Sequence, residues 1–580
     1  MIKFFNQHIE NFLVKESGYS KEDVILIKDK YKTEITDDLK KGHITTNIGL
    51  VSGSVTGTNP KEVAEALKKN LINLDGVDQI EVAGPGFLNI FLNRLYFVNL
   101  ITDSLNAKKA YGTSNLGEGQ KIQIEFVSAN PTGPLHVGHG RGAAFGDALG
   151  RILEASGYKV SKEYYINDAG RQIDILTVSV LLRLFKCFEE SSFPSSGYKG
   201  KYIVDISNEI DKKDYINENQ LKTIISNLPS DPEEEIDALI RNFKNEATEL
   251  WEHAKNKSLN IVLALIKEDL AAFKVDFNNW FYESSLGTLG DKESKLYSAI
   301  SQLQESGQAY KDEGALWLNT ENVGDDKNRV LIREDGRATY FAADVAYHKD
   351  KVDRGFDRLI NVWGSDHHGY IKRIESSLEG LGFSKERLHV QLVQFANLFQ
   401  GKEKIKMSTR SGKFFTLRNL IDEIGVDAAR FYYLSKQADQ HLDFDIELAK
   451  SQNKENLIYY IQYAHARICS LQNKYLELND SLPTSIKSIE DGAYLSCDKL
   501  IHEASKFPGV VQRSAAALQP HLLVFYLRDL AHQFHSFYND NPVLKESKEN
   551  QESILQSLNL VRLVIANGLN LLGIDALEKM

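Results

Sequence analysis

A chain of 580 residues is too long for one hydrophobic core, so its length predicts three or four domains. Its composition, 42% hydrophobic and 26% charged, is ordinary for a globular protein, and its net charge of −11 argues against nonspecific binding to polyanions while allowing local basic patches. No stretch approaches the roughly 18–20 apolar residues that span a bilayer, and the three scattered cysteines argue against a zinc ribbon or a disulfide framework, so we expect a cytosolic protein without a membrane segment or signal peptide.

The N-terminal residues 1–112 are predicted to form a separate α+β module. Apolar residues recur at helical spacing in Lys3–Ser17 and in Pro60–Ile72. An extended stretch, Ile80–Leu92, is interrupted by glycine and proline at Gly84–Gly86.

The next stretch reads as a buried strand, a tight loop and a helix. Ile122–Val127 is β-branched and alternating, prolines and glycine follow it, and apolar residues recur at helical spacing from Ala143 to Leu153. In such a unit the backbone approaches a phosphate closely, the helix N-terminus offers free N–H groups, and His136 and His139 can donate to phosphate oxygens. The pattern favours nucleotide binding, with structural histidines or metal ligands as alternatives.

Two further segments are predicted to bring polar side chains to the same sheet. Tyr164–Ile166 is a strand that ends in an Asn-Asp-Ala-Gly turn, and Arg358–Gly369 is an apolar strand that ends in a polar cluster. Within that cluster, hydrogen bonding is favoured over a metal site at Asp366–His368, because no further ligand follows at a familiar spacing. The acidic, mostly helical stretch 174–330 is predicted to be an insertion between the halves of the sheet.

A basic loop with small residues, Lys404–Lys413, follows another strand-like stretch. Beyond it, helical spacing continues through Thr416–Ile424 and Val426–Leu434, and residues 451–580 are helical by period almost throughout. By pattern alone the last part is a helix bundle.

The segments His136-Val137-Gly138-His139 and Lys406-Met407-Ser408-Thr409-Arg410 together resemble the two signatures of class I aminoacyl-tRNA synthetases. The residues around them resemble the bacterial arginyl enzymes over essentially the whole chain. The resemblance implies an α/β fold: a Rossmann-type parallel-sheet catalytic domain with an inserted domain, an N-terminal α+β module and a C-terminal all-α helical bundle. The implied domains are 1–112, contacting tRNA; 113–450, catalytic, with its insertion at about 174–330; and 451–580, binding the anticodon.

The resemblance also implies the reaction. L-Arginine and ATP would give arginyl-adenylate and pyrophosphate, and the arginine would then pass to the 3′-terminal adenosine of its tRNA. The implied partners are tRNA for arginine, L-arginine and ATP, with Mg²⁺ bound to ATP and no zinc. We expect a cytoplasmic monomer without a membrane partner.

The signatures assign residues to ATP and to catalysis. ATP binding is implied for His136, Gly138, His139, Lys406, Met407 and Ser408, and a catalytic role for His136, His139, Lys406 and Arg410. The chain departs from the family pattern at Thr409, where a second lysine is usual, and Gly133 stands where some relatives carry a compensating lysine. Lys406 and Arg410 therefore receive more weight, with Lys404 and Lys413 as contributors.

Specificity for arginine requires carboxylates, because a guanidinium presents planar donors that paired acceptors satisfy. Asp344 is the best candidate, with Tyr340 one helical turn earlier on the same face. Positions that match the family's pocket add Glu125 and Asn130, to hold the α-ammonium group and orient the substrate, and His367, where some relatives have glutamine.

The resemblance implies that Phe87 and Asn89 contact a D-loop base of tRNA by stacking and by an amide hydrogen bond. An ordinary core position in a strand is the alternative for Phe87.

Three rival functions remain: a class I synthetase for another amino acid such as cysteine, a nucleotidyltransferase that makes a small-molecule adenylate, and a non-catalytic tRNA-binding paralogue. The missing zinc cysteines and the acidic pocket argue against the first rival. The two terminal domains argue against the second, and the survival of both signatures argues against the third.

Overall fold

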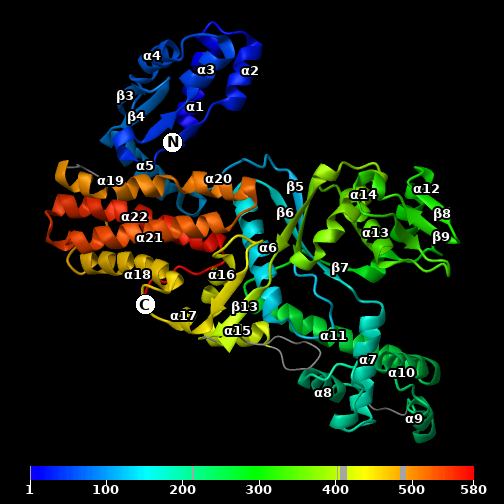
Figure 1. Ribbon diagram of the computed structural model, residues 1–580. Coiled ribbons are helices and arrows are strands. Elements are labelled where there is room, and N and C mark those ends of the chain that lie inside the picture. The colour runs from blue at the N-terminus through cyan, green and yellow to red at the C-terminus, as the bar shows by residue number, and fades with distance from the viewer. Residues whose placement is uncertain (1, 212–214, 402, 405–414, 484–490) are drawn as a thin grey trace.

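The computed structural model describes residues 2–211, 215–401, 403–404, 415–483 and 491–580 (Figure 1). An N-terminal module stands on a helical bundle, and a catalytic region with two lobes extends from the other side of the bundle. The α/β fold class, with its parallel catalytic sheet and C-terminal helical region, is confirmed.

The N-terminal module packs helices on an antiparallel sheet of order β1-β2-β4-β3. Leu88 and Ile90 of β4 are completely buried and alternate with residues on the other face of the sheet. The predicted interruption at Gly84–Gly86 is confirmed as the turn between β3 and β4. The elements are α1 (Ile2–Lys15), α2 (Lys21–Lys30), β1 (Thr33–Ile35), β2 (Ile44–Thr46), α3 (Ile48–Thr56), α4 (Pro60–Leu71), β3 (Val77–Ala83), β4 (Phe87–Leu92) and the connecting α5 (Arg94–Ala107).

The catalytic sheet has the order β12-β11-β5-β6-β7, and each adjacent pair is parallel. Its strands are β5 (Lys121–Glu125), β6 (Lys159–Ile166), β7 (Asn279–Tyr282), β11 (Arg358–Gly364) and β12 (Leu388–Val393), and its main flanking helices are α6 (Val137–Ala155), α7 (Arg171–Leu184), α11 (Thr248–Ala272), α13 (Tyr340–Asp353) and α14 (Ile371–Gly380). The strand order reverses between β5 and β11. In open parallel sheets such a switch point opens a crevice at the carboxyl ends of the strands, where ligands bind.

The stretch 174–330, predicted as one insertion, returns to the main sheet in its middle. A first lobe contains α8 (Lys201–Asn208), α9 (Glu218–Ile224) and α10 (Pro232–Glu246), packed beside α7 and α11 (Figure 1). The chain then forms the edge strand β7 before a second lobe of α12 (Lys295–Glu305), β8 (Ala309–Asp312), β9 (Ala315–Leu318) and β10 (Arg329–Ile332). A strand as short as β7 has too few residues to show alternation in the sequence.

Another small sheet, of order β14-β13-β15, links the catalytic region to the bundle. It consists of β13 (Ala396–Gln400), β14 (Glu403–Lys404) and β15 (Leu442–Asp445), and it is accompanied by α15 (Leu417–Ile424), α16 (Val426–Leu434) and α17 (Ile446–Lys450). The bundle contains α18 (Leu457–Leu476), α19 (Asp491–Ser505), α20 (Phe507–Ala517), α21 (His521–Asp540) and α22 (Lys548–Leu571).

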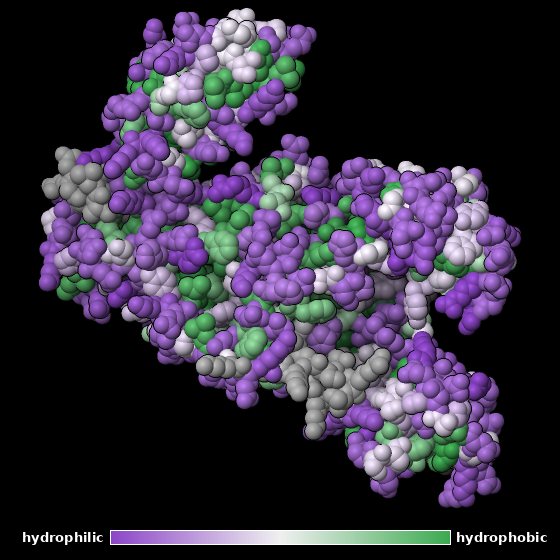
Figure 2. Space-filling view, in the orientation of Figure 1, coloured by the Kyte–Doolittle hydropathy of each residue, from purple (hydrophilic) through white to green (hydrophobic). Residues whose placement is uncertain are grey.

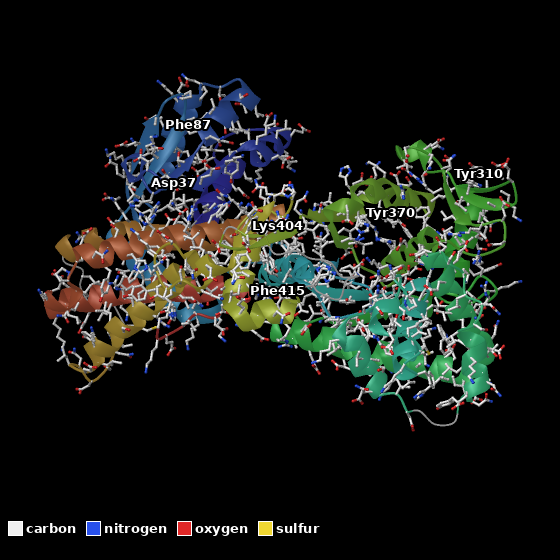
Figure 3. The ribbon with its side chains drawn as sticks, turned by 60° about the horizontal axis from the view of Figure 1, so that its bottom comes forward. Asp37, Phe87, Tyr310, Tyr370, Lys404 and Phe415 are labelled. Carbon is white, nitrogen blue, oxygen red and sulfur yellow. The ribbon has the colours of Figure 1, made fainter. Side chains whose placement is uncertain are left out.

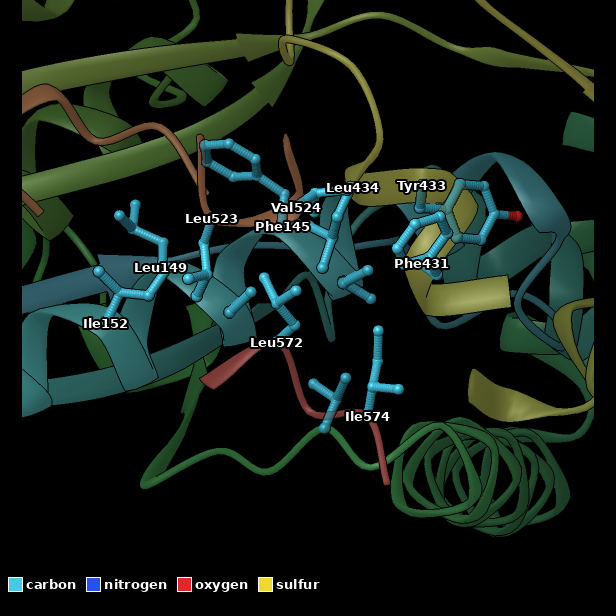
Figure 4. Packing of buried hydrophobic residues seen from close by; sticks show 14 of the residues in the cluster. Phe145, Leu149, Ile152, Phe431, Tyr433, Leu434, Leu523, Val524, Leu572 and Ile574 are labelled. Atoms are coloured by element: carbon cyan, nitrogen blue, oxygen red, sulfur yellow. The ribbon is translucent and has the colours of Figure 1, made fainter. Parts of the chain in front are cut away.

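Helix α6 packs directly against the bundle. Figure 4 shows Phe145 and Leu149 of α6 in one apolar cluster with Leu434 of α16, Leu523 of α21 and Leu572, which follows α22. The helix that begins at the first signature therefore shares its core with the C-terminal domain.

The N-terminal module is anchored to the bundle by polar contacts. The Nε2 atom of His502 lies 2.6 Å from the carbonyl oxygen of Thr36, and Lys506 Nζ donates to Asp37 Oδ1 at 2.6 Å. Both contacts join α19 and the residue after it to the segment between β1 and β2, so the module has a defined orientation.

Among the described residues, one helix, α22, is long and apolar enough to cross a membrane by length and composition. However, 61% of its most apolar window is buried inside the protein, as expected for the core helix of a bundle. The face of the molecule in Figure 2 is mainly hydrophilic, with hydrophobic residues in small groups.

Candidate active site

A pocket of about 290 Å³ lies at the switch point of the sheet. The loop after β5, the first turn of α6, the end of β11 and the residues after β12 form its wall. Its lining residues are Val127, Ser128, Ala129, Asn130, His136, Gly138, His139, Gly142, Val362, Trp363, Gly364, Asp366, His367, Val393, Gln394 and Phe395. The crevice predicted from the first signature is therefore present.

The loop begins with two left-handed residues. Strand β5 ends at Glu125, two residues before the predicted end, because Val127 and Ser128 have φ of 68° and 39°. A β-branched residue rarely adopts this conformation, which persists only where its surroundings hold it. Here Ser128 Oγ donates to Glu125 Oε1 at 3.1 Å and accepts from the backbone N–H of Tyr165 at 3.1 Å. The polar contacts thus fix the direction in which the loop leaves the sheet.

His136 and His139 are stacked at the N-terminus of α6, with ring centroids 3.7 Å apart. His136 is the N-cap, and its Nδ1 accepts from the N–H of Gly138 at 3.0 Å. The Nδ1 of His139 accepts from the N–H of His136 at 3.3 Å. Because both Nδ1 atoms accept, a neutral ring carries its proton on Nε2. Each imidazole is therefore oriented as an Nε2–H donor.

Burial decides the charge of these histidines. It lowers the pKa of His136, and together with the neighbouring His136 it lowers the pKa of His139 to about 3. At neutral pH the pair supplies hydrogen-bond donors without a formal charge, next to the free N–H groups of the helix terminus. Such a site can bind phosphate oxygens.

The second signature lies outside the described residues, which stop at Lys404 and resume at Phe415. This gap contains Lys406, Met407, Ser408, Thr409 and Arg410, as well as Lys413. The residues that resume the chain contact the first signature directly: Val137 N–H donates to the carbonyl of Phe415 at 3.2 Å, and Leu417 N–H to that of Leu135 at 2.8 Å. Figure 3 shows Lys404 and Phe415, the described residues on either side of this gap, in the middle of the molecule.

Asp344 lies on α13 in an acidic surrounding. Tyr370, at the end of the short helix η6 (Ser365–Tyr370), donates to Asp344 Oδ2 at 2.5 Å. Burial is the largest effect on the pKa of Asp344 and raises it, and the carboxylates of Glu125 and Glu283 raise it further. The Tyr370 hydrogen bond and Lys351 lower it, and the result is a pKa of about 7. A guanidinium would relieve this accumulation of carboxylates.

Glu283 is the second carboxylate near Asp344. It begins the short helix η4 (Glu283–Leu286) after β7, and its Oε2 accepts from the hydroxyl of Tyr165 at 2.9 Å. Burial raises the pKa of Glu283, and the Tyr165 hydrogen bond opposes that rise. Two carboxylates on different elements therefore approach the same space.

The other residues expected to bind arginine have different settings. Tyr340 is the first residue of α13 and is 60% exposed, in the same helix as Asp344 as predicted. Asn130 and His367 are exposed and line the pocket described above. Glu125 is buried and pairs with the buried ammonium of Lys351, 2.6 Å from its Oε2. Their roles toward arginine remain predictions.

Sequence reasoning missed Tyr165, Glu283, Lys351 and Tyr370. Their signals were weak, because each is a single polar residue in an aromatic or helical segment. Only the sequence Trp280-Phe281-Tyr282-Glu283, an aromatic strand that ends in an acid, resembles the other strand ends that carry site residues.

Within the ranges that the structure describes, no group of three or more His, Cys, Asp or Glu residues could hold a metal ion. At the segment considered above as an alternative metal site, His367 Nε2 lies 3.7 Å from Asp366 Oδ2. The cysteines Cys187, Cys469 and Cys497 are free thiols, the last two buried.

Phe87 and Asn89 lie on the face of β4 opposite Leu88 and Ile90. Phe87 is half-buried, and the Asn89 Oδ1 atom accepts from the Thr45 hydroxyl at 3.1 Å. Phe87 is therefore not a core residue like its neighbour Leu88, and its contact with tRNA stays a prediction.

Comparisons with known proteins cover the chain from end to end. The family model of the arginyl tRNA synthetase N-terminal domain matches residues 4–92, that of the catalytic domain of class I (R) tRNA synthetases matches 100–474, and that of the DALR anticodon-binding domain matches 461–580. An arginine–tRNA ligase of Hydrogenovibrio crunogenus is 42% identical over 95% of both chains, and one of Legionella pneumophila is 44% identical, also over 95% of both chains.

Solved structures agree with these matches. A Campylobacter jejuni structure described as an arginyl tRNA synthetase has a TM-score of 0.71 at 35% identity, covering 84% of this chain and 100% of its own. The arginyl-tRNA synthetase of Thermus thermophilus shares the fold, with a TM-score of 0.74 at 21% identity over 100% of both chains. The chain belongs to the arginyl-tRNA synthetase family, within class I of the aminoacyl-tRNA synthetases.

Proposed function

We propose that this member of the family ligates L-arginine to tRNA in two steps at the β5–β11 switch point. The observation that carries the proposal joins two features: His136 and His139 present neutral Nε2–H donors in the pocket, and Asp344 and Glu283 lie near Glu125, which bonds to Ser128 of the pocket loop. One side of this arrangement suits phosphate, and the other suits a guanidinium.

In the first step, the carboxylate of arginine attacks the α-phosphorus of ATP in line, a new P–O bond forms, and pyrophosphate leaves. His136 and His139 donate hydrogen bonds to phosphate oxygens as negative charge builds on them. Lys406 and Arg410 neutralise the leaving pyrophosphate, with Lys404 and Lys413 adding positive charge and Gly138, Met407 and Ser408 completing the ATP site. The protein supplies positioning and charge, and no nucleophile of its own.

Mg²⁺ enters as the complex with ATP. Among the described residues, the pocket wall offers one carboxylate, Asp366, which would add a protein ligand to an ion that arrives with ATP. Mg²⁺ held there would supply positive charge beside the phosphates.

In the second step, a ribose hydroxyl of the 3′-terminal adenosine of tRNA attacks the arginyl carbonyl, and AMP leaves. Asp344 and Glu283 accept the guanidinium, with Tyr340 beside them. Glu125, Asn130 and His367 hold the α-amino end. A half-buried pair of carboxylates favours a cationic side chain over a neutral one.

Domain roles complete the proposal. Residues 1–112 bind the outer corner of tRNA through Phe87 and Asn89, the lobes within 174–330 hold its acceptor end, and residues 451–580 bind the anticodon. We further propose a cytoplasmic location, which the free cysteines support, and a monomeric state. Light scattering on the purified protein tests the monomer.

The decisive experiment is pyrophosphate exchange into ATP with each of the twenty amino acids, with and without total tRNA. Exchange with arginine alone supports the reaction and its specificity together. Exchange with another amino acid would refute the proposal that the pocket around Asp344 selects arginine. No exchange in either condition would favour the small-molecule or non-catalytic rivals.

A further inference from the structure

Lys351 is completely buried on α13, about two helical turns after Asp344. Its ammonium donates to Glu125 Oε2 at 2.6 Å and to Asn361 Oδ1 at 2.9 Å, and it lies 4.3 Å from the centre of the Tyr347 ring. An ammonium is stable without water only where neighbouring acceptors replace its hydration. The lysine is therefore a fixed internal part of this region rather than a surface ion pair.

The contact with Glu125 continues into the loop that lines the pocket. Lys351 holds one oxygen of the Glu125 carboxylate, and the other oxygen accepts from Ser128 Oγ at 3.1 Å. Ser128 and Val127 are the two left-handed residues that turn the chain from β5 into the pocket. A strained turn requires contacts that hold it, and the Lys351–Glu125–Ser128 series provides them from behind.

The contact with Asn361 continues in the opposite direction. Asn361 lies on β11, and its Nδ2 donates to His348 Nε2 at 2.8 Å, while the Nδ1–H of His348 donates to the carbonyl of Asp344 at 2.8 Å. Burial lowers the pKa of His348 to about 3, which keeps this ring neutral and able to bridge an amide and a carbonyl. One ammonium thus connects β5, β11 and the part of α13 that carries Asp344.

Lys351 also acts on Asp344, whose pKa it lowers. Asp344 is faced by Glu125 from β5, Glu283 from η4, Tyr370 from η6 and Lys351 from its own helix. The lysine offsets one of three carboxylates. Asp344 and Glu283 remain to accept the guanidinium of arginine.

We propose that Lys351 is a positioning residue for arginine, which acts through Glu125 to orient the turn at Val127–Ser128 and the α-amino end of the substrate. This inference rests on the proposed function of the same pocket. Lys351 touches no substrate atom, because its side chain is enclosed by Glu125, Asn361 and Tyr347.

The test measures arginine-dependent pyrophosphate exchange in the presence of tRNA for Lys351→Met, Lys351→Arg and the wild type. Lys351→Met should raise KM for arginine at least about tenfold while changing KM for ATP by less than about twofold, because Glu125 is proposed to contact arginine, whereas backbone N–H groups of their own helix start hold His136 and His139. Lys351→Arg keeps the charge and should recover part of this loss. The acidic limb of the kcat/KM profile for arginine should move to higher pH in Lys351→Met, since Asp344 loses a neighbouring cation.

A double-mutant cycle distinguishes positioning from general damage, and it remains informative if Lys351→Met folds poorly. The pair Glu125→Gln and Lys351→Met removes both buried charges together, which is better tolerated than removing one. If Lys351 acts through Glu125, adding Lys351→Met to Glu125→Gln should change KM for arginine by less than about twofold. Fully additive losses would overturn the inference.

Lys385→Met is the matched control. Lys385 also forms an ion pair, 3.2 Å from Glu379, but its side chain is 42% exposed and it precedes the amino end of β12, opposite the pocket edge of the sheet. Its KM for arginine should equal that of the wild type. A Lys351→Met protein with a lower melting temperature but an unchanged arginine KM and pH profile would overturn the inference about Lys351 and leave the proposed function in place. A wild type without arginine-dependent exchange would overturn the proposed function and this inference with it.

Discussion

At the scale of single residues, burial determines the chemistry of the site. The first signature supplies two imidazoles that burial keeps neutral, and backbone N–H groups fix their donor atoms. At Asp344 the pKa shifts in the opposite direction, because burial and neighbouring acids raise it to about 7. The same physical cause therefore keeps the imidazoles uncharged and disfavours the negative charge of Asp344.

Replacing Asp344 with alanine should abolish arginine activation and leave the fold intact. Truncating one partner of a buried charge pair typically costs about 2–5 kcal/mol of binding free energy, which corresponds to a loss of roughly thirtyfold to several thousandfold. Pyrophosphate exchange measures the loss, and a circular-dichroism melt measures the fold. Asp353→Ala, at the exposed end of the same helix, is the control for Asp344→Ala and should retain activity. Wholesale unfolding of Asp344→Ala would contradict the second half of this prediction.

Arginine use should depend on pH through Asp344. Its pKa in the free enzyme is about 7, so protonation below that pH removes the charge that a guanidinium requires, and kcat/KM for arginine should fall by up to about tenfold per pH unit. Tyr370→Phe removes a hydrogen bond that lowers this pKa, so the limb should move to higher pH. A limb at the same pH in both proteins would show that another group titrates.

At the scale of elements, the position of α6 depends on close contact with the sheet. A Cβ added at Gly146 would lie 2.2 Å from the ring of Phe126, which follows β5. At Gly142, one turn earlier on the same helix, the position of a Cβ has no neighbour within 4 Å. The two glycines therefore have different roles in one helix.

Gly146→Ala should destabilise the protein by about 1–3 kcal/mol, because the helix must move away from Phe126. Gly142→Ala should stabilise it by about 0.5–1 kcal/mol, since alanine restricts the unfolded chain and fits the helix. Urea denaturation followed by circular dichroism measures both shifts. Shifts of the same sign would contradict the packing argument.

At the scale of the whole molecule, a buried guanidinium joins three parts of the chain. Arg430 of α16 pairs with Asp147 of α6 at 2.6 Å and donates to the carbonyls of Phe273 and Leu572. The salt bridge has no exposed surface on either side chain. It fixes the end of the C-terminal bundle to the helix of the first signature.

Arg430→Met should lower the stability of the protein by about 3–5 kcal/mol, because it leaves buried acceptors without their donor. The pair Arg430→Met and Asp147→Asn should lose more stability than Arg430→Met alone, since Asp147 also pairs with Arg151 and with the buried Lys162. The midpoints of denaturation compare the variants. If the stability of Arg430→Met lies within about 1 kcal/mol of the wild type, Arg151 and Lys162, which also pair with Asp147, replace the contact.

The sequence by itself determined the features that depend on neighbours along the chain. Helical spacing placed α4, α13, α15 and α16, glycine interrupted β3 and β4, and the strand–loop–helix pattern identified His136 and His139. Only the tertiary structure decided which distant residues meet. It ended β5 at Glu125 through two left-handed residues, brought β7 to the edge of the sheet, and placed Glu283 near Asp344 and Lys351 against Glu125, 226 residues away in the chain. Periodicity reports which face of an element is buried, whereas burial-shifted pKa values and buried ion pairs depend on the packing of elements that a parallel sheet brings together from distant parts of the chain.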